Sequence, residues 1–160
     1  MASTHLLTYM NDHVAGSRSA LDLLDHLIDA HPDADSRAFF TTLRADIDAD
    51  RQTLDTAIEK LGGGPSRLRE AGGWFADRMT RIKLAIDDPA GTGLHYLEAL
   101  ELLALGILGK RSLWRALEAV QPRVAALRDL DLPRLQARAE DQYARVEARR
   151  LNTAPLALAA

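Results

Sequence analysis

Apolar side chains recur at spacings of three and four along most of the chain, and no segment alternates apolar and polar residues over a strand's length. This period is typical of amphipathic helices, which turn one apolar stripe toward a common core. Proline and glycine clusters divide the chain, because both residues interrupt helices. The pattern predicts helices at about residues 4–30, 35–61, 66–87, 92–121 and 132–151, followed by an apolar tail at 153–160.

The expected helix boundaries rest on local signals. Pro32 ends the first helix, because the residue before a proline avoids the helical region. Asp33 is a capping candidate for the second helix, and a Gly-Gly-Gly-Pro run at 62–65 ends it. An aspartate followed by Pro133 is typical of a helix start, which places the beginning of the last helix near 132.

The connections predict how the helices are arranged. Short loops after the first and fourth helices make each an antiparallel neighbour of the next. A connection of about thirty residues, which contains the third helix, joins the two hairpins. With 160 residues, of which 47% are hydrophobic, we expect one all-α domain built as an up-down four-helix bundle.

Composition excludes several classes of function. The net charge of −3 argues against a dedicated nucleic-acid binder. The chain has no cysteine, which excludes disulfides, thiolate zinc sites and thiol catalysis. The apolar run 94–108 is shorter than the ~20 residues of a membrane span and contains two glutamates. Residues 1–13 lack the features of a signal peptide, so we expect a cytoplasmic protein that does not associate with membranes.

Polar residues interrupt each apolar stripe near its midpoint. On the fourth helix, the stripe that starts at Leu94 and Leu97 continues through Glu101 to Leu105 and Leu108, so Glu101 is expected to face the core. In an antiparallel bundle such midpoints fall in one layer. The expected central polar layer consists of Ser17, Asp50, Glu98, Glu101, Glu140, Tyr143 and Arg150.

This helix order and central layer resemble the ferritin-like superfamily over nearly the whole chain. The resemblance implies a metal site in the bundle centre, to which each hairpin contributes a Glu from one helix and a Glu-x-x-His pair from the other. Here the residue three positions after Asp50 is Thr53, and the residue three positions after Glu140 is Tyr143, where the family pattern has histidine. No Glu-x-x-His occurs in the chain. The resemblance therefore implies a degenerate, non-catalytic member without a cofactor, and it also implies a homodimer.

The chemistry of the layer admits more than one interpretation. In the first, arginines such as Arg51 and Arg150 hold the carboxylates in an ion-pair network, since a buried carboxylate without a partner is costly. In the second, oxygen donors bind Mg²⁺ or Mn²⁺, or iron in a metal store or oxidoreductase. The candidate ligands are Asp50, Glu98, Glu101, Glu140 and His13. In the third, the bundle binds a partner or a small apolar ligand between its helices.

Overall fold

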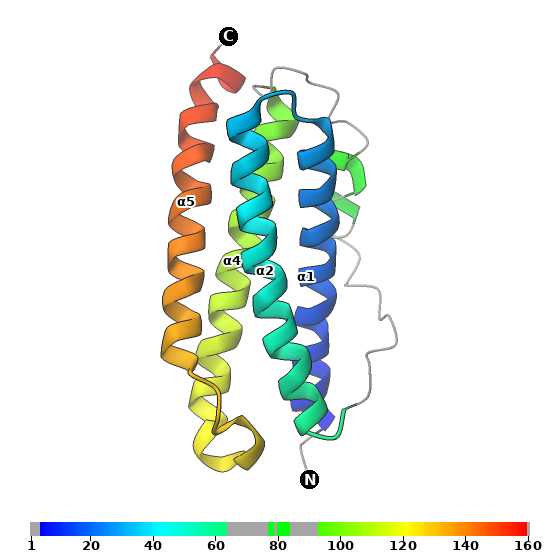
Figure 1. Ribbon diagram of the computed structural model, residues 1–160, viewed down its shortest axis with the longest axis vertical. Coiled ribbons are helices and arrows are strands. Elements are labelled where there is room, and N and C mark those ends of the chain that lie inside the picture. The colour runs from blue at the N-terminus through cyan, green and yellow to red at the C-terminus, as the bar shows by residue number, and fades with distance from the viewer. Residues whose placement is uncertain (1–3, 64–76, 79, 84–92, 160) are drawn as a thin grey trace.

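The computed structural model describes residues 4–63, 77–78, 80–83 and 93–159. Four helices lie side by side in a bundle (Figure 1) and have 27 residues each, or about 40 Å at 1.5 Å per residue. They are α1 (Thr4–Ala30), α2 (Ala34–Lys60), α4 (Leu94–Val120) and α5 (Leu132–Leu158). No strand occurs within these described ranges, which confirms the predicted all-α class.

The helices form two hairpins. Residues 31–33 connect α1 to α2, and two 3₁₀ turns, Gln121–Arg123 and Ala125–Leu127, connect α4 to α5. The two hairpins pack on each other mainly through α1 and α4 (Figure 1). Of the predicted helix at 66–87, residues 77–78 and 80–83 are helical, and the remainder lies outside the described residues.

Capping residues fix the helix ends where the sequence places them. The Asp33 carboxylate accepts a 2.8 Å hydrogen bond from the backbone N–H of Ser36 and so caps α2. The Asp131 carboxylate accepts one of 3.1 Å from the N–H of Arg134 at the start of α5. After α2 the chain turns at Gly62, whose φ of +79° suits glycine because other residues are strained there.

The core lies between the four helices and is dominated by leucine. Its largest fully buried side chains are Trp114, Phe40, Met10, Leu23, Leu24, Leu27, Leu43, Leu100, Leu103, Leu113, Leu117 and Leu127. Ile82, from the short helical piece at 80–83, is buried against this core. Within the described residues, no helix is both long enough and apolar enough to span a membrane.

The C-terminal end of α5 corrects the prediction. The helix was expected to end near 151, but it continues through Pro155 to Leu158 and takes in most of the tail at 153–160. Thr153 in these last turns is buried, and its hydroxyl donates to the Arg149 carbonyl on the same helix at 2.9 Å. Pro155 lacks the N–H for one i→i−4 hydrogen bond, yet the helix continues past it to Leu158.

Candidate functional site

The buried face of α4 differs from the predicted stripe. Glu101 is exposed, and Leu94 and Leu105 on the same stripe are 49% and 46% exposed. The face that enters the core includes Leu100, Leu103, Ala104, Ile107, Lys110, Leu113, Trp114 and Leu117. In a helix that is apolar on nearly all sides, periodicity alone does not determine which stripe faces the core. The polar residue that α4 brings into the core is thus a lysine and not the predicted glutamate.

Lys110 belongs to a buried polar cluster with Asp50 and Gln142, which come from α4, α2 and α5. The Lys110 ammonium donates to Asp50 Oδ2 at 2.6 Å and also to Gln142 Oε1. Gln142 Nε2 donates to the same Asp50 oxygen at 2.9 Å. The exposed fractions are 1% for Asp50, 8% for Lys110 and 1% for Gln142. Each polar side chain thus compensates part of the desolvation of the other two.

A second cation contacts the other oxygen of the Asp50 carboxylate. Arg138 Nη2 lies 3.1 Å from Asp50 Oδ1, and the arginine side chain is 36% exposed. Two cationic side chains therefore contact one carboxylate. Burial lowers the pKa of Lys110, while the charge of Asp50 and its hydrogen bond act to raise that pKa. The charge of Arg138 lowers the Lys110 pKa further.

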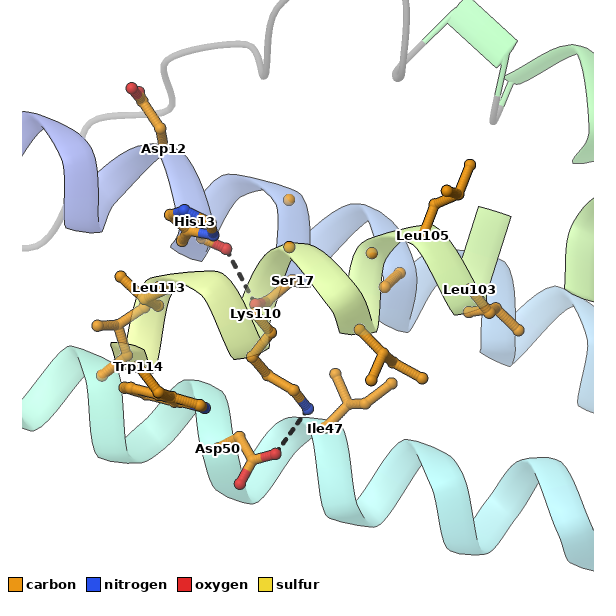
Figure 2. Close-up of a pocket in the computed structure, with 16 residues that line it drawn as sticks. Asp12, His13, Ser17, Ile47, Asp50, Leu103, Leu105, Lys110, Leu113 and Trp114 are labelled. Carbon is orange, nitrogen blue, oxygen red and sulfur yellow. Dashed lines mark hydrogen bonds and ion pairs between the residues drawn. The ribbon is translucent and has the colours of Figure 1, made fainter. Parts of the chain in front are cut away.

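A cavity of about 310 Å³ opens beside this cluster, between α1, α2 and α4. Figure 2 shows Asp50 and Lys110 at its α2 side, with Asp12 and Leu105 at the opposite, outer side. The apolar wall between these two ends consists of Ala20, Ile47, Leu54, Leu103, Ile107, Leu113 and the ring of Trp114. The cavity is thus mostly apolar and has one charged, buried end.

The cavity exists because α1 and α4 face each other with small residues. Gly16, Ser17 and Ala20 line it from α1, and Gly106 and Gly109 line it from α4. A Cβ atom placed on Gly16 or on Gly109 would meet no other atom within 4 Å. The two helices therefore leave room that larger side chains at these positions would fill.

Trp114 brings an unpaired donor to the same cavity. Its side chain is 1% exposed, and its Nε1–H has no acceptor among the described residues. Leaving such a group buried and unsatisfied costs about 1–3 kcal/mol. The indole N–H can only donate, so a group that satisfies it must be an acceptor. A molecule in the cavity is the natural source of that acceptor.

The structure brings only two members of the predicted central polar layer to the cavity, Ser17 and Asp50. The Ser17 hydroxyl donates to the carbonyl of His13, another cavity residue, at 2.9 Å (Figure 2). Tyr143 is only partly buried and packs at the margin of the core. Glu140 is exposed, with its carboxylate 3.6 Å from Arg111, so its predicted place in the layer is wrong.

The remaining predicted residues are engaged elsewhere. Glu98 accepts from Arg78 Nη2 at 2.8 Å and lies 3.2 Å from His95 Nδ1, near the start of α4. Arg150 binds Glu147 one turn away on its own helix, through two contacts of 2.7 Å. Arg150 is therefore engaged outside the cluster, because a carboxylate three residues away on α5 supplies its hydrogen bonds, and Glu101 acts on it only through its charge.

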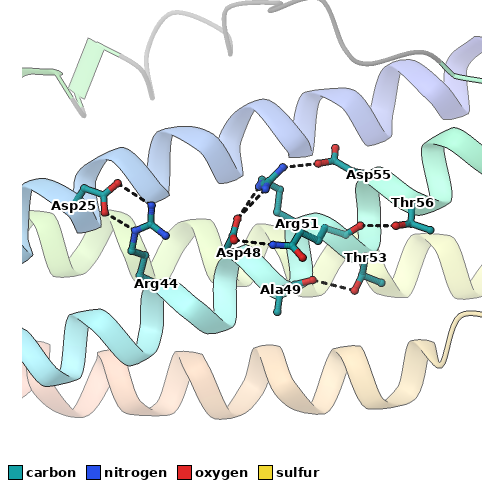
Figure 3. A network of polar contacts seen from close by, with 9 residues as sticks. Asp25, Arg44, Asp48, Ala49, Arg51, Thr53, Asp55 and Thr56 are labelled. Atoms are coloured by element: carbon teal, nitrogen blue, oxygen red, sulfur yellow. Dashed lines mark hydrogen bonds and ion pairs between the residues drawn. The ribbon is translucent and has the colours of Figure 1, made fainter.

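Arg51 is not the partner of its neighbour Asp50. It lies on another face of α2 and binds Asp48 at 2.9 Å and Asp55 at 2.5 Å (Figure 3). Residues three and four apart share a helix face, whereas adjacent residues do not. Sequence reasoning missed Lys110, Arg138 and Trp114. The available signal was that Lys110 lies on the stripe of Leu103 and Ile107, at spacings of three and four.

The site does not fit the metal that the ferritin-like resemblance implies. Among the described residues, no group of three or more histidine, aspartate or glutamate side chains could hold a metal ion. Asp50 is already bound by Lys110 and Arg138, so a metal cation there would face two positive charges. His13 is the one other predicted ligand that lines the cavity.

His13 makes the stability of the protein dependent on pH. Burial lowers its pKa from 6.5, and the charge of Asp12 opposes this shift. Below pH 6.5 the unfolded chain therefore binds a proton that the folded protein does not, so stability falls as pH drops toward the lowered pKa. We expect His13→Gln to weaken this loss between pH 6.5 and 5 in urea unfolding. If the free energy of unfolding changed with pH to the same extent in wild type and His13→Gln, this expectation would be wrong. His95→Gln is the control variant.

No protein family model, curated protein or solved structure matches this chain. The ferritin-like resemblance is therefore still a prediction. What the chain does must be inferred from the cavity and from the cluster at its inner end.

Proposed function

We propose that this protein is a non-catalytic helical bundle that binds a small, largely apolar molecule in the cavity between α1, α2 and α4. The observation that carries the proposal is the cavity itself. It combines an apolar wall with a buried charged end and with an unpaired donor, the Trp114 N–H. Ligand sites are typically concave and mostly apolar, with a few polar groups that orient the ligand.

The size of the cavity suits a compact ligand. Its volume of 310 Å³ is at the lower end of the range for small-molecule sites. At ~30 Å³ per water molecule, this volume corresponds to about ten waters, or a ligand of roughly ten non-hydrogen atoms. Water makes few favourable contacts with apolar walls of this kind. A ligand with an apolar body should therefore be favoured over water in the cavity.

A binding role suits the charged groups better than catalysis does. Lys110 and Asp50 form an ion pair, and Asp50 forms a second one with Arg138. Neither side chain is therefore free to act as a general acid or base. We further propose that the bundle is a degenerate ferritin-like one, in which this cluster occupies the place of the metal centre. A metal store is the less favoured alternative, because two cations already contact the carboxylate. A cytoplasmic location remains part of the proposal.

Cavity-filling variants test the proposal. A neutral apolar probe such as naphthalene should raise the melting temperature as its concentration increases. At a hundredfold excess over Kd it should raise the free energy of unfolding by about 2.7 kcal/mol. Gly109→Leu and Gly16→Leu extend side chains from α4 and α1 into the cavity and should abolish this effect. A probe that stabilises neither wild type nor variants, or all of them equally, would overturn the proposal.

Gly109→Ala is the matched control and carries its own prediction. A methyl group at this position meets open space, and alanine is about 1 kcal/mol better than glycine inside a helix. The variant should therefore be more stable than wild type by roughly 0.5–1 kcal/mol in urea unfolding, and should still bind the probe. A destabilised Gly109→Ala protein would show that the space beside Gly109 is already filled.

Self-association is a second candidate role, favoured by exposed leucines at one end of the bundle. Leu151, Leu156 and Leu158 on the last turns of α5 are 55%, 57% and 66% exposed. The same end of the bundle carries the start of α4 (Figure 1), where Leu94 is 49% exposed. We propose that a homodimer forms through this end. Sedimentation should show a dimer that Leu156→Glu dissociates, and a wild-type monomer at high concentration would refute it.

A further inference from the structure

The inner end of the cavity offers hydrogen-bond donors that the described residues do not use. Trp114 Nε1–H has no acceptor there. The Lys110 ammonium has three hydrogens and donates to Asp50 and Gln142, which leaves one hydrogen for a further acceptor. Both side chains line the cavity and both are more than nine-tenths buried. These donors suit a ligand group that accepts hydrogen bonds. Asp50 Oδ1 also lacks a hydrogen bond, but it lies 3.1 Å from the cationic Arg138 Nη2.

The charge balance at this end favours an anion. Lys110 and Arg138 contribute two positive charges, and Asp50 contributes one negative charge. Lys110, Arg138 and Asp50 together therefore carry one excess positive charge. Asp46 also acts on Lys110, but its carboxylate is already paired with Arg145 at 2.6 Å. Charges interact more strongly in such a buried place than in water, so an anionic acceptor gains more than a neutral one. A hydrogen bond to an ionised acceptor is also about twice as strong as one between neutral groups.

The rest of the cavity requires an apolar body. Beyond the cluster, the wall is formed by aliphatic side chains such as Leu103, Ile107 and Leu113. The polar groups at the outer side are Asp12, which is exposed to water, and His13 and Ser17, which are half-buried. Water and salt screen the charge of Asp12, so it opposes the entry of an anion only weakly.

We propose that the cavity binds a monocarboxylate with a compact apolar body, whose carboxylate accepts hydrogen bonds from Trp114 and Lys110. This inference rests on the proposed function and names the class of its ligand. An amine of the same shape would meet Lys110 as a like charge. An alcohol could accept the same hydrogen bonds but would leave the extra positive charge unbalanced.

Matched probes test the ligand class. Two sets of probes have a suitable size, and each contains a carboxylate, an alcohol and an amine. The flexible set is octanoate, octanol and octylamine. The flat set is phenylacetate, phenylethanol and phenylethylamine. Calorimetric titration at neutral pH should show each carboxylate binding at least tenfold more tightly than the alcohol of its set. The amines should show no binding.

Two variants connect this preference to the named groups. Trp114→Phe keeps most of the ring but removes the N–H, and should weaken carboxylate binding about tenfold, the ratio that corresponds to 1.4 kcal/mol. Lys110→Met should bring carboxylates and alcohols to equal affinity. Because Lys110→Met could also disturb folding, Trp114→Phe is the decisive variant, and its fold is checked by circular dichroism.

The outcomes separate the two proposals. Alcohols or amines that bind as tightly as the carboxylates would overturn the monocarboxylate assignment and leave the cavity as a ligand site. An unchanged carboxylate affinity in Trp114→Phe would also overturn that assignment. If none of the six molecules binds, or if Gly109→Leu binds them as wild type does, the proposed function itself fails.

Discussion

Replacing Asp50 by asparagine is expected to lower the free energy of unfolding by about 3–5 kcal/mol, the usual result when one partner of a buried ion pair is removed. The substitution preserves shape and removes charge. It leaves the Lys110 ammonium buried beside Arg138 with no carboxylate in the cluster. Lys110→Met should cost less, because Asp50 then retains Arg138 and the amide of Gln142. Urea unfolding of both variants at neutral pH measures this asymmetry.

The pH dependence of Asp50→Asn provides a second readout. Burial already lowers the pKa of Lys110, and loss of Asp50 removes the charge and the hydrogen bond that act most strongly to raise it. Between that lowered pKa and 10.5, the unfolded chain binds a proton that the folded protein does not, so stability rises with pH. Wild type gains stability in the same way above its own Lys110 pKa. The difference in stability between Asp50→Asn and wild type should therefore narrow only between the two folded-state pKa values of Lys110, where the variant alone gains stability.

Asp48→Asn is the matched control, because it makes the same chemical change on the same helix. Asp48 binds Arg51 at 2.9 Å, but its side chain is 28% exposed (Figure 3). Such ion pairs contribute about 0–1 kcal/mol, so this variant should remain close to wild type. Equal losses of unfolding free energy in Asp48→Asn and Asp50→Asn would show that burial does not determine how much Asp50 contributes to stability.

The helices could be predicted from the sequence because their signals are local. The Asp33 cap, the turn at Gly62 and the Asp131 cap each act within one helical turn, and each lies where the sequence indicated. Asp50 could also be placed in the core, because the polar residues of α2 leave a single apolar stripe that contains it. The extension of α5 past Pro155 could not be predicted, because a proline normally marks the end of a helix.

The site could be predicted only in part, because α4 is apolar on nearly all sides. Its sequence permits a stripe through Glu101 as readily as one through Lys110, and the choice depends on which face meets α5 and α1. Predicting the cavity also requires knowing how neighbouring helices face each other. Gly16 and Gly109 create an opening only because α1 and α4 bring them to the same level of the bundle. Spacing within one helix does not reveal the level at which two helices meet.

Replacing Trp114 by alanine is expected to lower the free energy of unfolding by about 3–5 kcal/mol, the range for removal of a buried tryptophan or phenylalanine. The side chain is 1% exposed and forms part of the cavity wall. Its removal should therefore enlarge an existing ligand site instead of creating an isolated void. Indole replaces the missing ring and should restore part of the lost stability, because a ligand that binds only the folded protein stabilises it.

Phe40→Ala is the matched control for the stabilisation of Trp114→Ala by indole. Phe40 is also fully buried, and its loss should cost a similar 3–5 kcal/mol, but it does not line the cavity. Melting curves with increasing indole should show a larger rise for Trp114→Ala than for Phe40→Ala or wild type. An equal rise in both variants would mean that indole enters any void in the core. No rise in Trp114→Ala would mean that the bundle collapses around the missing ring, so that the cavity wall is not rigid enough to hold a ligand site open.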